Sequence, residues 1–232
     1  MLNNEFLEGK TLTFNKPIGW SSFDLVKKVK NLIRSKYNLK KIKVGHAGTL
    51  DPLAEGLMVI CTGKHTKNIS KIQGCMKIYS GEITLGKTTP SYDLETDFDK
   101  YYNTNHIEKK QILHLAKGFH GETLQKPPLF SALKIKGERL YKKARRGEKV
   151  KIPARKIFIE SFKITNIDMP IISFRIVCGK GTYIRSLAYD FGKKLNSGAH
   201  LSKLCREGIG DYKLDDAYDI KTFQEELNTD VT

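Results

Sequence analysis

Apolar and polar residues alternate in two stretches of the first 85 positions, and between them apolar residues recur at helical spacing. Residues 11–14 and 76–85 alternate as half-buried strands do. From Ser21 or Ser22, either of which can cap a helix, the pattern changes to the helical period. The predicted buried face of this helix consists of Phe23, Val26, Val29, Leu32 and Ile33. The apolar run at residues 57–61 predicts a buried strand, and a short helix follows near 66–73.

The remaining chain continues with strands and helices that do not alternate regularly. Helical periodicity predicts helices over 107–119, 137–146 and 182–195, the last of these following a Gly-Lys-Gly turn. Strands are predicted over 156–167, 171–178 and from 198 onward, whereas 86–104 is polar and irregular. Strands interspersed with helices, without βαβ alternation, indicate an α+β fold. Because no repeat, low-complexity linker or composition boundary is visible, we expect a single domain over residues 1–232.

Bulk composition is that of a globular protein. Hydrophobic residues make up 39% of the 232 positions and charged residues 28%, which does not fit a disordered chain. No apolar run approaches the roughly 20 residues that span a bilayer. The N-terminus lacks the basic and then apolar order of a signal peptide. We therefore expect a cytoplasmic protein.

The charge of the chain is strongly positive and unevenly placed. Lys and Arg number 41 against 25 Asp and Glu, a formal net charge of +16. Residues 211–232 hold seven of the acids and only two lysines, so the first 210 residues carry a net +21. A polyanion partner such as nucleic acid explains this balance, and a solubilising basic surface explains it equally well.

Several short motifs have ordinary explanations. Residues 81–88 match the phosphate-binding pattern GxxxxGK[ST], but the middle of the match looks like strand and Pro90 follows where a helix should run. The fragment His120-Gly121-Glu122 lacks the cysteine pair of a zinc deaminase. The remaining histidines have no ligand spacing, and no cysteine pair has the CxxC spacing of a zinc or redox motif. Cys61 and Cys178 lie in apolar, strand-like runs, so they are expected to be small core residues.

The stretch from residue 44 to residue 56 is the most unusual part of the chain. It reads Val44-Gly45-His46-Ala47-Gly48-Thr49-Leu50-Asp51-Pro52-Leu53-Ala54-Glu55-Gly56. Glycine permits backbone conformations that other residues avoid, and proline fixes φ and removes a donor. The stretch therefore predicts a shaped loop that presents His46 and Asp51. Taken alone, Asp51 is a turn aspartate that bonds its own backbone or a positioned catalytic carboxylate.

This loop resembles the catalytic loop of the TruB family of tRNA pseudouridine synthases, and other motifs extend the resemblance in order along most of the chain. The family patterns KPxGxSS, QxPPxYSALK, KGTYIR and GAHxxxLxR are similar to stretches beginning at Lys16, Gln125, Lys180 and Gly198, with Phe130 in place of the usual tyrosine. The stretch Lys77-Ile78-Tyr79 resembles the motif whose tyrosine meets the target base. The chain ends soon after Ile220, so the resemblance is to a short form without the C-terminal RNA-binding PUA domain.

The resemblance implies a fold, a reaction and a partner. The fold is the pseudouridine synthase fold, with a mixed, mostly antiparallel central sheet flanked by helices and a basic insertion over about residues 120–152. The reaction is isomerisation of the T-loop uridine at tRNA position 55, on a base flipped out of the RNA. No cofactor or metal is implied. The partner is the T-arm stem-loop of tRNA, and we expect a monomer with no obligate protein partner and no membrane association.

The resemblance also assigns roles to individual side chains. Asp51 is the catalytic carboxylate, acting as nucleophile or general base, and Arg185 is the cation that keeps it ionised. Tyr79 stacks on the base and is a candidate for proton transfer. The remaining substrate-binding candidates are His46, Tyr183, Ile184, Leu204 and Lys16.

The basic run in the insertion has two explanations. Nine cations lie between residues 134 and 151, and we select Lys142 and Arg146 as RNA-binding candidates. A solvated helix face is the usual meaning of such a run. The resemblance favours contact with RNA, because the family's insertion closes over the T loop.

Overall fold

The computed structural model describes residues 4–135, 137–148 and 150–229, which form two compact units. Unit 1 comprises Met1–Tyr79 and Cys205–Thr232, and unit 2 comprises Ser80–Leu204. Two basic residues of the insertion, Lys136 and Lys149, lie outside the described residues. The organisation of residues 1–232 as one catalytic domain stays a prediction.

Unit 1 is built on a sheet whose central strand is buried on both faces. Strand β3 pairs antiparallel with β1 and β2 and parallel with the last part of β12, where Arg206 lies opposite Gly56. The strands are β1 (Thr11–Lys16), β2 (Val44–His46), β3 (Glu55–Thr62), β12 (Ala199–Ile209) and β13 (Tyr212–Lys213). A strand covered on both faces needs apolar residues at every position, which explains the continuous apolar run from residue 57 to 61.

Helices cover the two faces of this sheet. On one face Leu57, Val59 and Cys61 pack with Ile72 of α3. Elsewhere in unit 1 an aromatic cluster joins β1 to α7, with the rings of Phe14 and Phe223 5.0 Å apart. The helical elements of unit 1 are α1 (Glu5–Glu8), α2 (Ser22–Lys36), η1 (Gly63–Asn68), α3 (Ile69–Gly74), η2 (Leu214–Asp216) and α7 (Ile220–Thr229).

The predicted buried face of α2 is partly wrong. Ser21 is the N-cap, and it forms a capping box with Asp24, so the helix begins at Ser22. The buried residues are Ser22, Leu25, Val26, Val29 and Ile33, which recur at i, i+3, i+4, i+7 and i+11. Phe23 lies about 100° around the helix from Ser22 and is 70% exposed.

Unit 2 contains the rest of the sheet. Its strands follow the order β12, β4, β11, β10 and β7, with β10 antiparallel to both of its neighbours. The bounds are β4 (Lys77–Leu85), β7 (Gly121–Gln125), β10 (Arg155–Asp168) and β11 (Ile171–Cys178). Both β4 and β12 supply residues to the two units. Strand β3 is parallel to β12, whereas the pairs β1–β3, β2–β3, β10–β11, β7–β10 and β12–β13 are antiparallel. The expected mixed, mostly antiparallel sheet in an α+β fold is confirmed.

Aromatic rings form the core of unit 2. The ring of Phe162 on β10 lies within 6 Å of Phe119, Phe174 and Phe191, which come from three other segments. The helices here are α4 (Lys109–Lys117), α5 (Leu140–Arg145) and α6 (Ile184–Lys194). Buried Cys178 lies at the end of β11, and Cys61 is buried in unit 1, as expected of small core residues.

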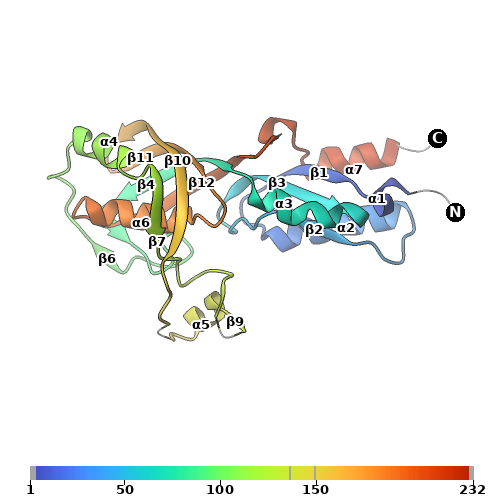
Figure 1. Ribbon diagram of the computed structural model, residues 1–232, viewed down its shortest axis with the longest axis horizontal. Helices are drawn as coiled ribbons and strands as arrows, with labels where there is room; N and C mark the ends of the chain where they lie inside the picture. Colours follow the sequence, from blue (N-terminus) through green and yellow to red (C-terminus); the bar gives the residue numbers. More distant parts are fainter. Residues whose placement is uncertain (1–3, 136, 149, 230–232) are drawn as a thin grey trace. The chain divides into compact units, whose positions relative to one another are not determined.

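Two segments of unit 2 differ from the predicted elements. Residues 86–104 include the short pair β5 (Lys87–Thr88) and β6 (Lys100–Tyr101). The helix predicted over 137–146 is shorter, because the chain first makes a hairpin of β8 (Lys134–Ile135) and β9 (Glu138–Arg139), with Gly137 at φ +83°. Helix α5 then buries Leu140 and Ala144, and with β9 it stands apart from the other elements of unit 2 (Figure 1).

The phosphate-binding pattern at residues 81–88 is part of a strand. Gly81–Leu85 belong to β4, so the backbone donors that would cradle a phosphate are not arranged as a loop before a helix. A Cβ at Gly81 would lie 2.3 Å from the backbone oxygen of Lys203 on β12. Close strand packing therefore explains this glycine.

Candidate active-site loops

The Asp51 loop connects β2 to β3, and the first residue of α2 and the segment before it hold the loop from one side. The hydroxyl of Ser22 donates to the carbonyl of Leu50 (2.9 Å) and accepts from its N–H (2.8 Å). The N–H of Gly19 donates to the carbonyl of Pro52 (2.8 Å). Asp51 thus lies between two anchored residues, and the stretch that begins at Lys16 has the physical task of fixing the position of this carboxylate.

Arg206 holds the same loop from inside unit 1. It is 1% exposed, and its guanidinium donates to the carbonyls of Leu57 (2.7 Å) and Gly48 (3.0 Å). Gly56 has φ +102°, and a Cβ there would lie 2.4 Å from the carbonyl oxygen of Arg206. This glycine lets β3 approach β12 closely enough for the arginine to reach both carbonyls. Arg206 is the last residue of the GAHxxxLxR pattern, but the pattern alone does not predict this contact.

Lys16 is completely buried beside these groups. Its ammonium donates to the carbonyls of Pro17 (2.9 Å) and Trp20 (2.7 Å). Burial lowers the pKa of Lys16 to about 8, and the neighbouring carboxylates, Asp51 first among them, act in the opposite direction. Lys16 therefore places a buried positive charge near Asp51, and its two hydrogen bonds fix the backbone of residues 17–20.

His46 and Tyr79 complete the predicted residues of unit 1. His46 lies on β2 opposite Ile60, and burial lowers its pKa, so a neutral imidazole is favoured. Tyr79 lies on β4 and is 9% exposed. Unit 1 thus carries Lys16, His46, Asp51 and Tyr79.

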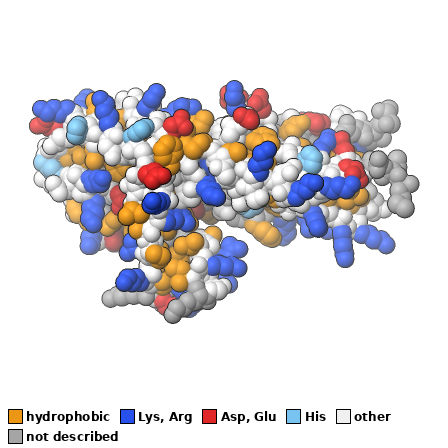
Figure 2. Space-filling model, viewed as in Figure 1, with side chains coloured by type: hydrophobic (Ala, Val, Ile, Leu, Met, Phe, Trp, Pro, Cys, Tyr) orange, Lys and Arg blue, Asp and Glu red, His pale blue; other side chains and the backbone are white. Residues whose placement is uncertain are grey.

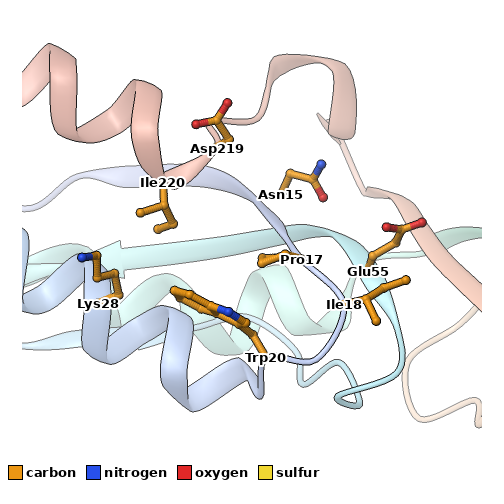
Figure 3. Close-up of a pocket in the computed structure, with 8 residues that line it drawn as sticks. All are labelled: Asn15, Pro17, Ile18, Trp20, Lys28, Glu55, Asp219 and Ile220. Carbon is orange, nitrogen blue, oxygen red and sulfur yellow. The ribbon is translucent and has the colours of Figure 1, made fainter.

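A pocket of about 540 Å³ adjoins the segment that anchors Asp51 (Figure 3). The ring of Trp20 lies below Ile220 of α7, and Glu55 and Ile18 lie at the other end of the pocket. Two carboxylates, Glu55 and Asp219, line it against one ammonium, that of Lys28. The net charge of these three side chains is negative and repels phosphate groups, so we do not assign the pocket to RNA.

In unit 2, Gln125 at the end of β7 positions Tyr183. The side chain of Gln125 accepts from the N–H of Tyr183 (2.8 Å) and donates to its carbonyl (3.0 Å). The guanidinium of Arg155 lies over the Tyr183 ring, 4.8 Å from its centroid. The stretches that begin at Gln125 and Lys180 are therefore joined at Tyr183, the residue before α6.

Arg185 lies in the first turn of α6 and is held by the turn of residues 89–96, in which Ser91 and Asp93 are buried. It is 3% exposed, and its guanidinium donates to the carbonyl of Ser91 (3.0 Å) and lies 3.5 Å from the carboxylate of Asp93. The other carboxylate oxygen of Asp93 accepts from the N–H of Glu95 (3.0 Å). Sequence reasoning treated residues 86–104 as irregular and missed this contact, because polar turn residues give no periodic signal. Ile184 is buried beside Arg185, and Leu204 is the last residue of unit 2.

The basic insertion is less positive than its sequence suggests. Arg146 makes two hydrogen bonds to the carboxylate of Glu138 (2.7 and 2.8 Å) and also pairs with Glu148. Lys143 pairs with the same two glutamates. Hydrogen bonds from Arg146 lower the pKa of Glu138 to about 2. Within the described part of the chain, Lys142 is in no ion pair.

The predicted site residues thus form two anchored groups, one in each unit. The residues that sequence reasoning missed are those that hold the loops: Ser22, Arg206, Gln125, Ser91 and Asp93. Among the described residues, no three or more His, Cys, Asp or Glu side chains are placed to hold a metal ion together. None of the helices described is both long and apolar enough to span a membrane.

Comparison with known proteins explains why these loops resemble one family. The model of "TruB family pseudouridylate synthase (N terminal domain)" matches residues 34–184. A protein named tRNA pseudouridine synthase B from Flavobacterium johnsoniae is 56% identical over 98% of this chain and 100% of its own length. The protein of the same name from Parabacteroides distasonis is 49% identical over 91% of this chain and 90% of its own.

The solved structures agree on the fold. The chain superposes on one from a Cbf5-Nop10-Gar1 complex with a TM-score of 0.71 and 26% identity, covering 95% of this chain and 54% of that one. A chain from an archaeal box H/ACA sRNP Nop10-Cbf5 complex gives a TM-score of 0.69 at 22% identity, with 96% and 55% covered. The expected pseudouridine synthase fold is confirmed. The chain belongs to the TruB family of pseudouridylate synthases.

Proposed function

We propose that this protein converts a uridine of tRNA into pseudouridine, that the uridine is position 55 of the T loop, and that Asp51 is the catalytic carboxylate. The observation that carries the proposal is the anchoring of Asp51 on both sides, by Ser22 at Leu50 and by Gly19 at Pro52. Relatives that match nearly the whole chain are named tRNA pseudouridine synthase B. The net charge of +16 suits a polyanionic substrate.

The reaction needs a carboxylate in a fixed place. The bond between the sugar C1′ and the uracil N1 breaks, the base turns, and a bond from C1′ to C5 forms, while the proton lost from C5 is balanced by one gained at N1. A carboxylate can attack the sugar or remove a proton from it. The position of this carboxylate matters because a displacement of about 1 Å can lower the reaction rate roughly 100-fold.

The other roles follow from the family resemblance. Tyr79 offers an aromatic face to the flipped base, and Arg185 is the cation of the reaction, held ready by Ser91 and Asp93. His46 occupies the place that the flipped base leaves. Tyr183, Ile184 and Leu204 line the base pocket, and Lys142 and Arg146 meet the T arm. The proposal includes a monomeric enzyme in the cytoplasm that needs no cofactor.

The test is to incubate the purified protein with an unmodified tRNA transcript and to map pseudouridine at single-nucleotide resolution. We expect one modified position, the T-loop uridine. The variant Asp51→Asn keeps the shape of the side chain but loses the carboxylate, so it should form no pseudouridine while its RNA affinity stays within severalfold of the wild type. Turnover by this variant, or modification at another position, would overturn the assignment.

A further inference from the structure

A second concave surface of unit 1 carries six cations. It has a volume of about 680 Å³ and is lined by the end of α2, the segment after it and the start of η1. Its basic residues are Lys30, Arg34, Lys40, Lys41, Lys43 and Lys64, and we call it the basic groove. Leu7, Ile42 and Gly63 complete its walls. In Figure 2, blue side chains gather over the part of unit 1 that carries α1 and α2 in Figure 1.

The positive charge of the basic groove is almost uncompensated. Lys64 pairs with Glu8. In the described structure no carboxylate forms an ion pair with the other five cations. Arg34 donates through Nε to the carbonyl of Leu39 (3.2 Å), which fixes the direction of its side chain without neutralising it. Like charges held around one concave surface repel each other, and this repulsion is relieved when an anion binds.

The insertion offers a direct comparison within the same chain. There Lys143 and Arg146 share Glu138 and Glu148, and Arg145 pairs with Glu95. A cation that already has a carboxylate partner gains less from a phosphate than one that has none. Three cations of the insertion are thus already paired, whereas five of the six cations of the basic groove have no carboxylate partner among the described residues, so the groove is a second surface that can bind an anion.

The basic groove and the Asp51 loop lie at opposite ends of the same pair of strands. The Asp51 loop connects the end of β2 to the start of β3, whereas Lys43 precedes β2 and Lys64 follows β3. Strand β3 has eight residues, which at about 3.3 Å per residue separates its ends by roughly 20 Å. A single flipped nucleotide does not reach from one end to the other, so the basic groove is a separate site.

We infer that the basic groove binds backbone phosphates of the substrate RNA outside the T loop. The inference rests on the proposed function for the identity of the RNA. An RNA backbone presents one negative charge at every nucleotide, and a row of lysines and arginines that contacts it gains affinity by releasing counterions. The groove carries no sequence information of its own, so it adds affinity for the larger RNA without changing which uridine reacts.

The experiment compares two variants with four substitutions each and two RNAs. The groove variant carries Lys30→Ala, Arg34→Ala, Lys40→Ala and Lys41→Ala. The control variant removes the same charge from exposed positions of unit 2, with Lys109→Ala, Lys117→Ala, Lys156→Ala and Lys163→Ala. Equilibrium binding is measured by fluorescence anisotropy between about 50 and 200 mM salt, and thermal melting verifies that both variants fold. The RNAs are a whole tRNA transcript and a minimal T-loop hairpin.

We expect the groove variant to bind whole tRNA at least 10-fold more weakly than the control variant at low salt, with a salt slope that is smaller by about 2 to 4. Binding of the minimal hairpin should change less than threefold, and kcat on either RNA should not change. The inference is wrong if the groove variant loses as much affinity for the hairpin as for whole tRNA. It is also wrong if the groove and control variants bind whole tRNA equally well. Binding is measured without turnover, so a failure of the proposed function shows as wild-type protein that binds tRNA and forms no pseudouridine.

Discussion

Lys16 is the residue at which burial and charge compete most directly. Its pKa falls from 10.5 to about 8 on folding because the ammonium loses its water. Between these two values the unfolded chain binds more protons than the folded one, so stability must rise with pH. We predict that the free energy of unfolding, measured with urea, rises between pH 7.5 and 9.5 by about 1 to 2 kcal/mol more in the wild type than in Lys16→Met. Tyrosines and cysteines titrate in both proteins and cancel in the difference. Parallel pH profiles would show that Lys16 keeps an ordinary pKa.

Tyr79 allows its two proposed roles to be separated at the level of a single atom. Tyr79→Phe keeps the aromatic face and removes the hydroxyl, whereas Tyr79→Leu removes both. If the hydroxyl transfers a proton, the phenylalanine variant should bind tRNA normally and lose roughly 100-fold or more in kcat, the usual range for a general acid or base. Single-turnover rates at saturating enzyme measure this directly. A phenylalanine variant with nearly normal rates would leave Tyr79 a stacking role alone.

At the scale of elements, two adjacent serines at the start of α2 have different structural roles. Ser21 caps the helix, whereas Ser22 bonds both backbone groups of Leu50 beside Asp51. Ser21→Ala should lower the free energy of unfolding by about 1 kcal/mol and leave kcat unchanged. Ser22→Ala leaves a buried N–H and carbonyl unpaired, which costs about 2 kcal/mol or more. It should also lower kcat roughly 10- to 100-fold at constant KM, because the carboxylate is no longer held in place. Equal kcat values for the two variants would contradict the anchoring role of Ser22.

The elements also show how far sequence reasoning reaches. The turns within residues 16–22, 44–56 and 180–185 were predictable because glycine, proline and capping residues act locally. Long strands such as β10 and β11 were predicted nearly to their bounds by their alternation. The buried contacts of Arg206 were not predictable, since its acceptor carbonyls lie about 150 residues earlier in the chain. Helix α5 is shorter than predicted because Gly137 adopts a left-handed conformation and closes the β8–β9 hairpin. The helical spacing of apolar residues over 137–146 gave no sign of this hairpin.

At the scale of the whole molecule, the net charge of +16 is distributed over surfaces that differ in how many of their cations are paired with carboxylates. The sequence shows nine cations in the insertion and the resemblance favours their contact with RNA, but a sequence does not show which cations are already paired. In the structure Glu138 and Glu148 hold Lys143 and Arg146 in one network, whereas five cations of the basic groove have no ion pair among the described residues. The acidic segment from residue 211 onward adds a further asymmetry to unit 1.

This distribution leads to a prediction in which removing acids reveals whether the insertion meets RNA. The double variant Glu138→Gln and Glu148→Gln releases Lys143 and Arg146 and raises the net charge by two. If the insertion contacts the T arm as proposed, affinity for tRNA should rise severalfold, and the salt slope should steepen by about 1 to 2 as two more phosphates are neutralised. The matched control is Glu122→Gln and Glu160→Gln, two exposed acids of unit 2 that pair with no cation in the described residues. Filter binding over a salt series measures both variants. Equal slopes in the two variants would show that the released cations face solvent and that the insertion does not bind the RNA.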